Sequence, residues 1–244
     1  MKTVELDEAI RDLVAANRIL AYHRVVDAFG HISVRHPENS GRYLLSRSRS
    51  PELVTESDII EFDLDSNPID QRDRNLYIER PIHGCIYQAR PDVTAVCHNH
   101  AHSLIPFSVT KVPVRPIFHF AAGIGSEVPV WDISDDFGHA TNLLVVNNDQ
   151  GRSLASRLGS RPACLMRGHG SVVATTNIKA TVLVAISLMQ NAAMLSEALK
   201  MGDVKYLAEG ELDALADVLL RPGTLARAWE YWCRNVGIIT EIND

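Results

Sequence analysis

The sequence predicts an α/β protein that folds as one domain around a mixed or antiparallel sheet. Its 244 residues are enough to bury one large hydrophobic core. Helical and strand-like segments are interspersed along the chain, without the regular strand–helix–strand alternation of a parallel sheet. Because no linker, repeat or low-complexity stretch interrupts this pattern, we expect residues 1–244 to form a single domain.

The N-terminal third predicts one helix followed by short strands. Apolar residues recur at helical spacing through residues 5–28, which predicts a long amphipathic helix that ends before Gly30. Pro, Asn and Gly residues then separate short β-type segments. These predicted strands are residues 31–35, 43–45 and 59–62.

The remaining two thirds predict alternating helices and buried strands. Residues 79–89 should form a helix with Pro81 in its first turn, where the missing N–H costs little. Buried strands are expected at 92–97 and 163–167, with a helix at 143–158 between them. The predicted C-terminal helices are residues 179–201, 211–220 and 224–235.

Charge and composition exclude several classes of function. Lys and Arg number 24 against 30 Asp and Glu, for a net charge of -6, so the chain lacks the basic surface that nucleic acids and anionic membranes require. No run of about 18 apolar residues and no signal-peptide pattern occurs, which predicts no membrane association. The four cysteines are far apart and form no CxxC pair, as expected for reduced thiols in a cytoplasmic protein.

Histidine is abundant, with 10 residues in the chain, and it is the commonest protein metal ligand and acid–base group. The sharpest local feature is His98-Asn99-His100, directly after a predicted buried strand. Residues two apart in a strand point to the same side, so His98 and His100 can present two imidazoles to one ion. The alternative interpretation is a polar strand end with solvated histidines.

Two further segments can complete such a site. His169 lies between Gly168 and Gly170 after a predicted strand, where the glycines leave its ring unshielded. Glu79 and His83 are four residues apart, on one face of the predicted helix. Alone, Glu79 is typical of a helix cap, but beside three imidazoles it is a candidate fourth ligand or general acid/base. Three histidines and one displaceable group favour a catalytic Zn²⁺ or Mn²⁺ over a closed structural site.

The ordered set of motifs resembles the class II aldolase/adducin family over roughly residues 8–200. The resemblance implies a three-layer α/β/α fold around a mostly antiparallel sheet, and a homotetramer with active sites at the subunit interfaces. The matching motifs are Gly30-x-x-Ser33, Leu53-Val54-Thr55-x-x-Asp58-Ile59, Glu79-x-x-x-His83-x-x-x-Tyr87, Arg90-Pro91-Asp92-x-x-Ala95-Val96-x-His98-x-His100 and Gly168-His169-Gly170.

The resemblance also implies roles for particular residues. His98, His100 and His169 would hold the metal, with Glu79 as a movable ligand and acid/base. Imidazole and carboxylate ligands accept both Mn²⁺ and Zn²⁺, so the ligand set leaves the metal open. At the first motif, His31 replaces the Asn of sugar-phosphate aldolases.

Other departures from the aldolases concern the substrate. The loop that holds a phosphate in those enzymes has a Thr-Gly pair, whereas here it contains Arg47 and Arg49, and two serines before the catalytic Glu are replaced by Tyr77 and Ile78. Arginine forms bidentate pairs with carboxylates, so this loop suits a carboxylated substrate. The alternative is that both arginines are solvated on a surface strand.

The segment around Arg115-Pro116-Ile117-Phe118-His119 resembles the decarboxylase branch of the family, typified by 3-hydroxy-2-methylpyridine-4,5-dicarboxylate decarboxylase. His119 falls near the position where aldolases place a catalytic tyrosine from a neighbouring subunit. It is therefore a candidate catalytic proton donor alongside Glu79, the alternative being a histidine packed at a subunit contact.

The sequence thus predicts a divalent-metal-dependent decarboxylase of an ortho-hydroxy aromatic dicarboxylate, either a hydroxypyridine or a dihydroxybenzene, in aromatic or vitamin B6 catabolism. The alternatives are a class II aldolase acting on a sugar phosphate or other hydroxy-keto substrate and, more remotely, a noncatalytic adducin-like interaction module. The expected substrate contacts are His31, Ser33, Arg47, Arg49, Tyr77 and His83.

Overall fold

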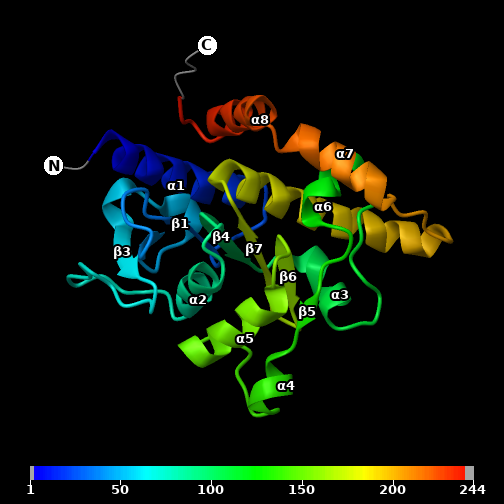
Figure 1. Cartoon of the computed structure of the whole chain (residues 1–244), viewed down its shortest axis with the longest axis horizontal. Coiled ribbons are helices and arrows are strands. Elements are labelled where there is room, and N and C mark those ends of the chain that lie inside the picture. The colour runs from blue at the N-terminus through cyan, green and yellow to red at the C-terminus, as the bar shows by residue number, and fades with distance from the viewer. Residues whose placement is uncertain (1–2, 240–244) are drawn as a thin grey trace.

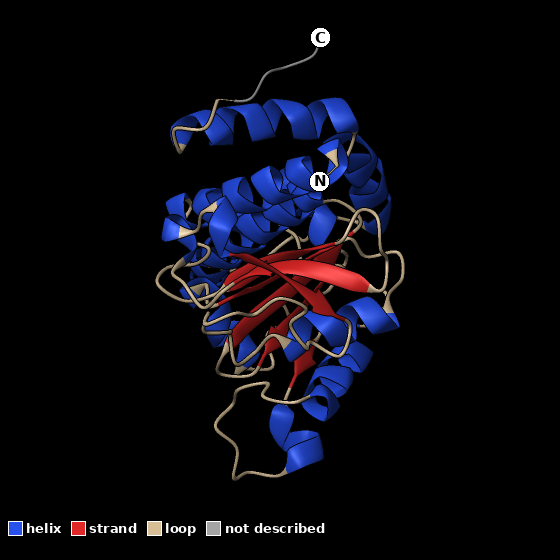
Figure 2. Ribbon diagram, turned by 90° about the vertical axis from the view of Figure 1, so that its left-hand side faces the viewer, coloured by secondary structure: helices blue, strands red, loops and turns tan. Residues whose placement is uncertain are grey.

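The computed structural model describes residues 3–239, and its elements form three layers with the sheet in the middle (Figures 1 and 2). The seven strands have the order β3-β2-β1-β4-β7-β6-β5. Every neighbouring pair is antiparallel except β5 and β6, so the predicted mostly antiparallel sheet is confirmed. The strands are β1 (His31–Arg35), β2 (Arg42–Ser46), β3 (Ile59–Asp63), β4 (Ala95–Asn99), β5 (Val130–Trp131), β6 (Ala163–Met166) and β7 (Gly170–Thr175).

Helices cover both faces of this sheet (Figure 1). On one face lie α1 (Val4–Tyr22) and α6 (Ile178–Met201), with α7 (Glu209–Leu219) and α8 (Pro222–Asn235) outside them. On the other face lie α2 (Pro81–Ala89) and α5 (Asn148–Leu158). The shorter helices are α3 (Ile105–Ser108), α4 (Ile133–Phe137) and the 3₁₀ turns Pro51–Leu53, Glu56–Asp58, His102–Leu104 and His119–Ile124.

Strand alternation divides the core into two clusters. Side chains of successive strand residues point to opposite faces. In β4, Cys97 packs with the cluster under α1 and α6, whereas Val96 packs with the cluster under α2 and α5. The same alternation sends His98 to the α2 side. In β1 it sends Ile32 to the α1 side, and therefore His31 to the α2 side.

Several element boundaries differ from the predictions for local backbone reasons. The first helix ends at Tyr22, because the chain turns at Arg24, which has a φ of 60°. The α5 helix starts at Asn148 and not at residue 143, because the Asn147 side chain caps its N-terminus. Strand β7 was not predicted; it pairs with both β4 and β6.

Helix α6 is long and apolar enough to cross a membrane by length and composition alone. However, 67% of its most apolar window is buried inside the fold. Its side chains pack against the sheet and α1 in the larger core cluster. The apolar character of α6 is therefore explained by its position in the core.

Candidate metal centre

Three histidines from two neighbouring strands meet at one end of the sheet. His98 lies in β4, His100 follows that strand, and His169 lies in the turn between β6 and β7. Antiparallel pairing of β4 with β7 sets Asn99 opposite Ser171, so the end of one strand lies beside the start of the other. The register therefore brings together histidines about 70 positions apart in the sequence.

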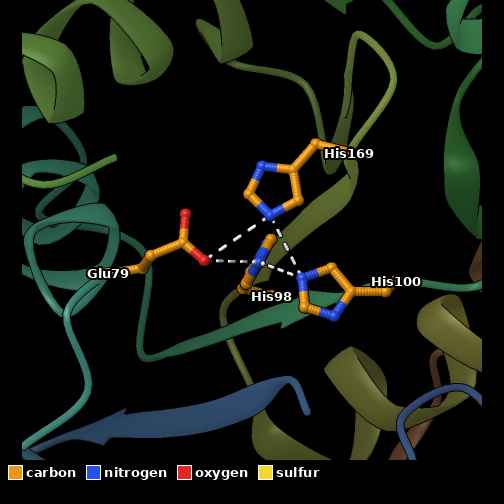
Figure 3. A group of neighbouring side chains, drawn as sticks. All are labelled: Glu79, His98, His100 and His169. Carbon is orange, nitrogen blue, oxygen red and sulfur yellow. Dashed lines mark hydrogen bonds and ion pairs between the residues drawn. The ribbon is translucent and has the colours of Figure 1, made fainter. Parts of the chain in front are cut away.

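The ring nitrogens of these histidines converge (Figure 3). Nε2 of His100 lies 3.0 Å from Nε2 of His98 and 3.1 Å from Nε2 of His169. The Glu79 Oε2 atom closes the group, 3.4 Å from His98 Nε2 and 3.5 Å from His169 Nε2. One ligand atom from each of the four residues lies within 4.8 Å of all the others.

Backbone carbonyls orient two of the rings. His98 Nδ1 lies 3.1 Å from the Ser171 carbonyl oxygen, and His169 Nδ1 lies 2.9 Å from the Leu143 carbonyl oxygen. Each Nδ1–H therefore donates to a carbonyl, which leaves the Nε2 atoms of both rings with free lone pairs. Burial, reinforced by His98 and His169, lowers the pKa of His100 to about 4, so the His100 ring is neutral at pH 7.

This donor set fits a divalent cation. Neutral imidazole nitrogens that point at one another repel unless a positive charge lies between them. Ligands about 2.0–2.1 Å from a tetrahedral Zn²⁺ lie about 3.3 Å from one another, close to the separations observed here. The carboxylate of Glu79 supplies a fourth, displaceable oxygen, as in catalytic and not structural sites.

Glu79 occupies a turn before α2, not the helix itself. Because α2 begins at Pro81, the expectation that Glu79 and His83 share one helix face is wrong. The backbone N–H of Val145 donates to Glu79 Oε1 over 3.0 Å, which leaves Oε2 toward the histidines. Burial raises the pKa of this carboxyl, whereas His98 and His169 in their protonated forms outweigh that effect and lower it below its usual range.

A cavity of about 680 Å³ opens onto the metal-ligand group. His100 and Glu79 line it, together with the apolar side chains of Phe29 and Ile78, which are 68% and 59% exposed. The polar residues of the wall include His31, Arg49 and Tyr77. Three of the six predicted substrate contacts therefore line one cavity with two of the predicted metal ligands.

The two predicted arginines bind the same carboxylate. Arg47 and Arg49 both donate to the buried Asp58, Arg49 over 2.7 Å. Burial alone raises the pKa of Asp58, but hydrogen bonds from Arg47, Thr55 and Arg49 lower it to about 2. Of the two arginines, Arg49 lines the cavity. Tyr77 donates to the Arg49 carbonyl and so holds this loop against the cavity wall.

The other predicted site residues lie elsewhere. Ser33 and His83 are fully buried behind the cavity wall, so the structure gives them no direct contact with a ligand in it. His119 is exposed in the turn His119–Ile124, where its ring packs against Phe120 at 4.1 Å between centroids. It does not line the cavity of its own chain.

Sequence reasoning missed the groups that orient the ligands. The carbonyls of Leu143 and Ser171 and the N–H of Val145 are backbone atoms, which no residue pattern reveals. Asp58 was noted only as part of a family motif. The spacing of Asp58 from the two arginines in the sequence does not predict their ion pairs, because these depend on how β2 pairs with β3.

Comparison with known proteins agrees with this geometry. The Class II Aldolase and Adducin N-terminal domain matches residues 11–196. The chain belongs to the class II aldolase/adducin family. The family predicted from the order of the motifs is therefore confirmed.

Several curated relatives of the chain are named decarboxylases. Decarboxylase tropJ of Talaromyces stipitatus is 33% identical over 93% of both chains. The 3,4-dihydroxyphthalate decarboxylase of Arthrobacter keyseri is 31% identical over 85% of this chain and 86% of the relative. The predicted resemblance to the decarboxylase branch is confirmed, and the chain groups with carbon–carbon lyases.

Solved structures with the same fold extend over most of the chain. An aldolase II superfamily protein from Pseudomonas syringae superposes with a TM-score of 0.79 at 20% identity, covering 96% of this chain and 94% of that one. L-fuculose 1-phosphate aldolase from Glaciozyma antarctica PI12 gives 0.76 at 21% identity, with 97% and 92% covered. At these identities the likeness concerns the fold, and it confirms the predicted class II aldolase-like architecture.

Proposed function

We propose that the protein is a divalent-metal-dependent decarboxylase of an ortho-hydroxy aromatic dicarboxylate. The observation that carries this proposal is the single cavity that joins the Glu79–histidine group to Arg49 and to apolar walls. Support comes from relatives named decarboxylases, one of them for 3,4-dihydroxyphthalate, a benzene ring with two hydroxyls and two carboxylates.

The charges around the cavity suit a dianion. Arg47 and Arg49 share the single carboxylate of Asp58, which leaves one positive charge in excess at this wall. Three neutral histidines with Glu79 offset only half the charge of a divalent ion. A protein with a net charge of -6 can therefore present a locally positive pocket to a dicarboxylate.

The shape of the cavity suits a flat ring. Phe29, Ile78 and Leu144 provide apolar surface, and the ring of Tyr77 lies 4.5 Å from that of His31. These surfaces can cover the faces of an aromatic ring while Arg49 meets a carboxylate at its edge. Positioning of this kind fixes the scissile carboxylate relative to the acid/base.

The chemical step breaks a carbon–carbon bond and replaces CO₂ with a proton on the ring carbon. When bound, a divalent ion acts as a Lewis acid toward the ring oxygen, which accepts the electrons released in this step. Glu79 Oε2 lies on the cavity side, so the carboxylate can accept the proton that the ring hydroxyl of the substrate releases and deliver it to the ring carbon that loses CO₂. Arg49 holds the carboxylate that does not react.

The test is product analysis with the Mn²⁺-loaded protein. We expect CO₂ release from 3,4-dihydroxyphthalate or a hydroxypyridine dicarboxylate. Release of an aldehyde from L-fuculose 1-phosphate, with no CO₂ from either acid, would show that the protein is an aldolase instead.

A matched pair of variants tests the role of Glu79. Glu79→Gln should retain bound metal through the three histidines yet lose turnover by about 100-fold or more, because general acid–base catalysis contributes about 10²–10⁴-fold. Glu61→Gln removes a partly buried carboxylate in β3, away from the cavity, and should leave turnover unchanged. Near-normal activity of Glu79→Gln would remove Glu79 from the mechanism.

We also propose that the protein acts as a homotetramer in which His119 reaches a neighbouring cavity. Support comes from the family resemblance and from the exposure of His119 beside Phe120, which is 46% exposed. Mixing inactive Glu79→Gln and His119→Gln subunits should restore part of the activity, because some interfaces would then combine both native residues. Absence of restored activity, with mixed oligomers present, would place both residues in one subunit or exclude His119.

A further inference from the structure

A buried chain of hydrogen bonds leads from the cavity wall into the core behind it. His31 Nδ1 lies 2.6 Å from His83 Nε2, and His83 Nδ1 lies 2.6 Å from Ser33 Oγ. Ser33 Oγ in turn lies 2.8 Å from the Tyr87 hydroxyl. Strand β1 contributes His31 and Ser33 on the same side, and α2 contributes His83 and Tyr87 one helical turn apart.

All four groups are shielded from water and uncharged. The exposed fraction is 4% for His31, 1% for Tyr87 and 0% for the other two. Burial lowers the pKa of His83 to about 3, and burial together with His83 and His98 lowers the pKa of His31. Burial raises the pKa of Tyr87, so its hydroxyl keeps its proton. Each of these hydrogen bonds therefore contains one proton, which either partner can carry.

These protons can all point toward the cavity or all point away from it. If the protons point away from the cavity, Ser33 donates to the Tyr87 hydroxyl oxygen. The proton of that hydroxyl then needs another acceptor. Within residues 3–239, that hydroxyl is bonded to Ser33 and to the backbone of Val96, whose hydrogen bond lowers the pKa of Tyr87, as an N–H donor does, so neither group accepts this proton. A buried donor without an acceptor disfavours this arrangement by about 5- to 150-fold.

The favoured arrangement defines the tautomer of His31. Tyr87 donates to Ser33, Ser33 donates to His83 Nδ1, and His83 Nε2–H donates to His31 Nδ1. Neutral His31 must then carry its own proton on Nε2. This Nε2 has no hydrogen-bond partner among the described residues and is not one of the unpartnered polar atoms closed off from solvent. Because His31 lines the cavity and its Nδ1 is bonded to His83 in the core, we infer that Nε2–H is the side of the ring open to the cavity.

We propose that Tyr87, Ser33 and His83 are positioning residues that hold the proton of His31 on Nε2, so that His31 donates a hydrogen bond to a carboxylate oxygen of the substrate. The assignment of the acceptor as a carboxylate oxygen of the substrate rests on the proposed function. The ring of His31 lies 5.1 Å from that of His98, which puts the acceptor beside the metal ligands. None of these four side chains changes its charge in this role, so the Nε2–H donor of His31 is present throughout the neutral pH range.

The first test reads the tautomer directly. Protein labelled with ¹⁵N-histidine and loaded with diamagnetic Zn²⁺ is compared with its His31→Gln variant to assign the His31 nitrogens. We expect Nε2 of His31 to show the shift of a protonated nitrogen and Nδ1 that of an unprotonated one. The reverse pattern in the native protein would overturn the proposal by itself, whether or not the Ser33 variants fold.

Variants of Ser33 test the link inside the chain. Ser33→Ala removes the donor to His83, so the two tautomers of His31 should become similarly populated and both nitrogens should move to intermediate shifts. Ser33→Thr keeps the hydroxyl and should restore the native spectrum. Ser187→Ala, which removes a buried serine hydroxyl from α6, is the matched control for lost stability and should leave the spectrum unchanged. A native spectrum in Ser33→Ala would overturn the proposed chain.

Binding of phthalate tests the donor toward the ligand. Phthalate is an aromatic dicarboxylate without the ring hydroxyl, so its binding is measured without turnover. His31→Leu, which has no donor, should weaken binding about tenfold or more, whereas His31→Gln, which offers an amide N–H, should retain most of it. In Ser33→Ala the competent tautomer falls to about half, and the affinity should fall about twofold.

Equal phthalate affinity in His31→Leu and the native protein would refute the contact. If the protein released no CO₂ from any hydroxy-aromatic dicarboxylate, the proposed function would fail. The His31 spectrum and phthalate affinity would still decide the tautomer and its contact separately.

Discussion

Replacing Gly170 with alanine should move the candidate metal ligands His100 and His169 apart. A Cβ atom at this position would lie 2.0 Å from the Asn99 carbonyl oxygen and 3.2 Å from the Cα of His100, where ordinary contacts are 3.4–4 Å. The backbones of β4 and β7 must therefore separate by more than about 1 Å. Relief of this kind of overpacking costs about 1–3 kcal/mol.

Separation of the two strands would move His169 and His100 apart, because Gly170 directly follows His169 and Asn99 directly precedes His100. Their Nε2 atoms are now 3.1 Å apart, and metal–ligand distances tolerate changes of about 0.2 Å. A shift of about 1 Å should lower metal affinity at least about 100-fold, equivalent to about 3 kcal/mol. The measurement is metal content after dialysis and titration against a competing chelator.

Gly168 provides the matched control on the other side of His169. Its φ is +63°, and the nearest atom to an added Cβ is 3.8 Å away. Gly168→Ala should therefore cost about 1–2 kcal/mol of folding stability through backbone strain alone and keep native metal affinity. Native affinity in Gly170→Ala, or equal losses in both variants, would refute this reasoning.

Three further predictions follow from the charged groups. Asp58→Asn should cost up to about 2 kcal/mol at pH 7, because hydrogen bonds from the arginines lower the pKa of Asp58 to about 2 against the opposing effect of burial. The pKa of Asp58 is lower in the folded than in the unfolded protein, so its contribution to stability is complete above about pH 4 and is lost as the pH falls toward 2. If urea denaturation still showed the full stability difference between the native protein and Asp58→Asn at pH 2, this explanation would be contradicted. Arg49→Lys should raise KM about tenfold, whereas Arg47→Lys, away from the cavity, should change it less than about twofold; equal effects would contradict the placement of the arginines. Chelation should lower the Tm by about 5–10 °C relative to protein at a metal concentration 100 times its Kd, because bound metal then contributes about 2.7 kcal/mol; an unchanged calorimetric Tm would argue against a metal in this site.

The candidate metal ligands could be predicted from the sequence because the patterns that mark them are local. His98 and His100 are two residues apart at a strand end, and His169 lies between two glycines, so spacing alone marks each segment. The motif order then related the segments to one another. The three-layer fold and the mostly antiparallel sheet followed from the same resemblance and agree with the structure.

The groups that surround the candidate ligands could not be predicted, because they depend on atoms that meet only in the folded chain. Ser33 and His83 were expected to touch substrate, yet they lie behind the wall and bond to each other. Arg47 was expected as a substrate contact, but it pairs with Asp58 away from the cavity. Strand β7 was missed because a glycine turn conceals its start, although it carries the carbonyl that orients His98.

The sequence by itself determined which side chains form the candidate metal centre and which family of folds carries them, because short spacings and strand alternation are properties of local backbone geometry. Only the tertiary structure decided the orientation of each imidazole, the arginine that lines the cavity, and the tautomer of His31. These depend on contacts between segments 26 to 73 residues apart, such as the carbonyls of Leu143 and Ser171 with their histidines. Their positions are set by strand register and helix packing, which no single stretch of sequence encodes.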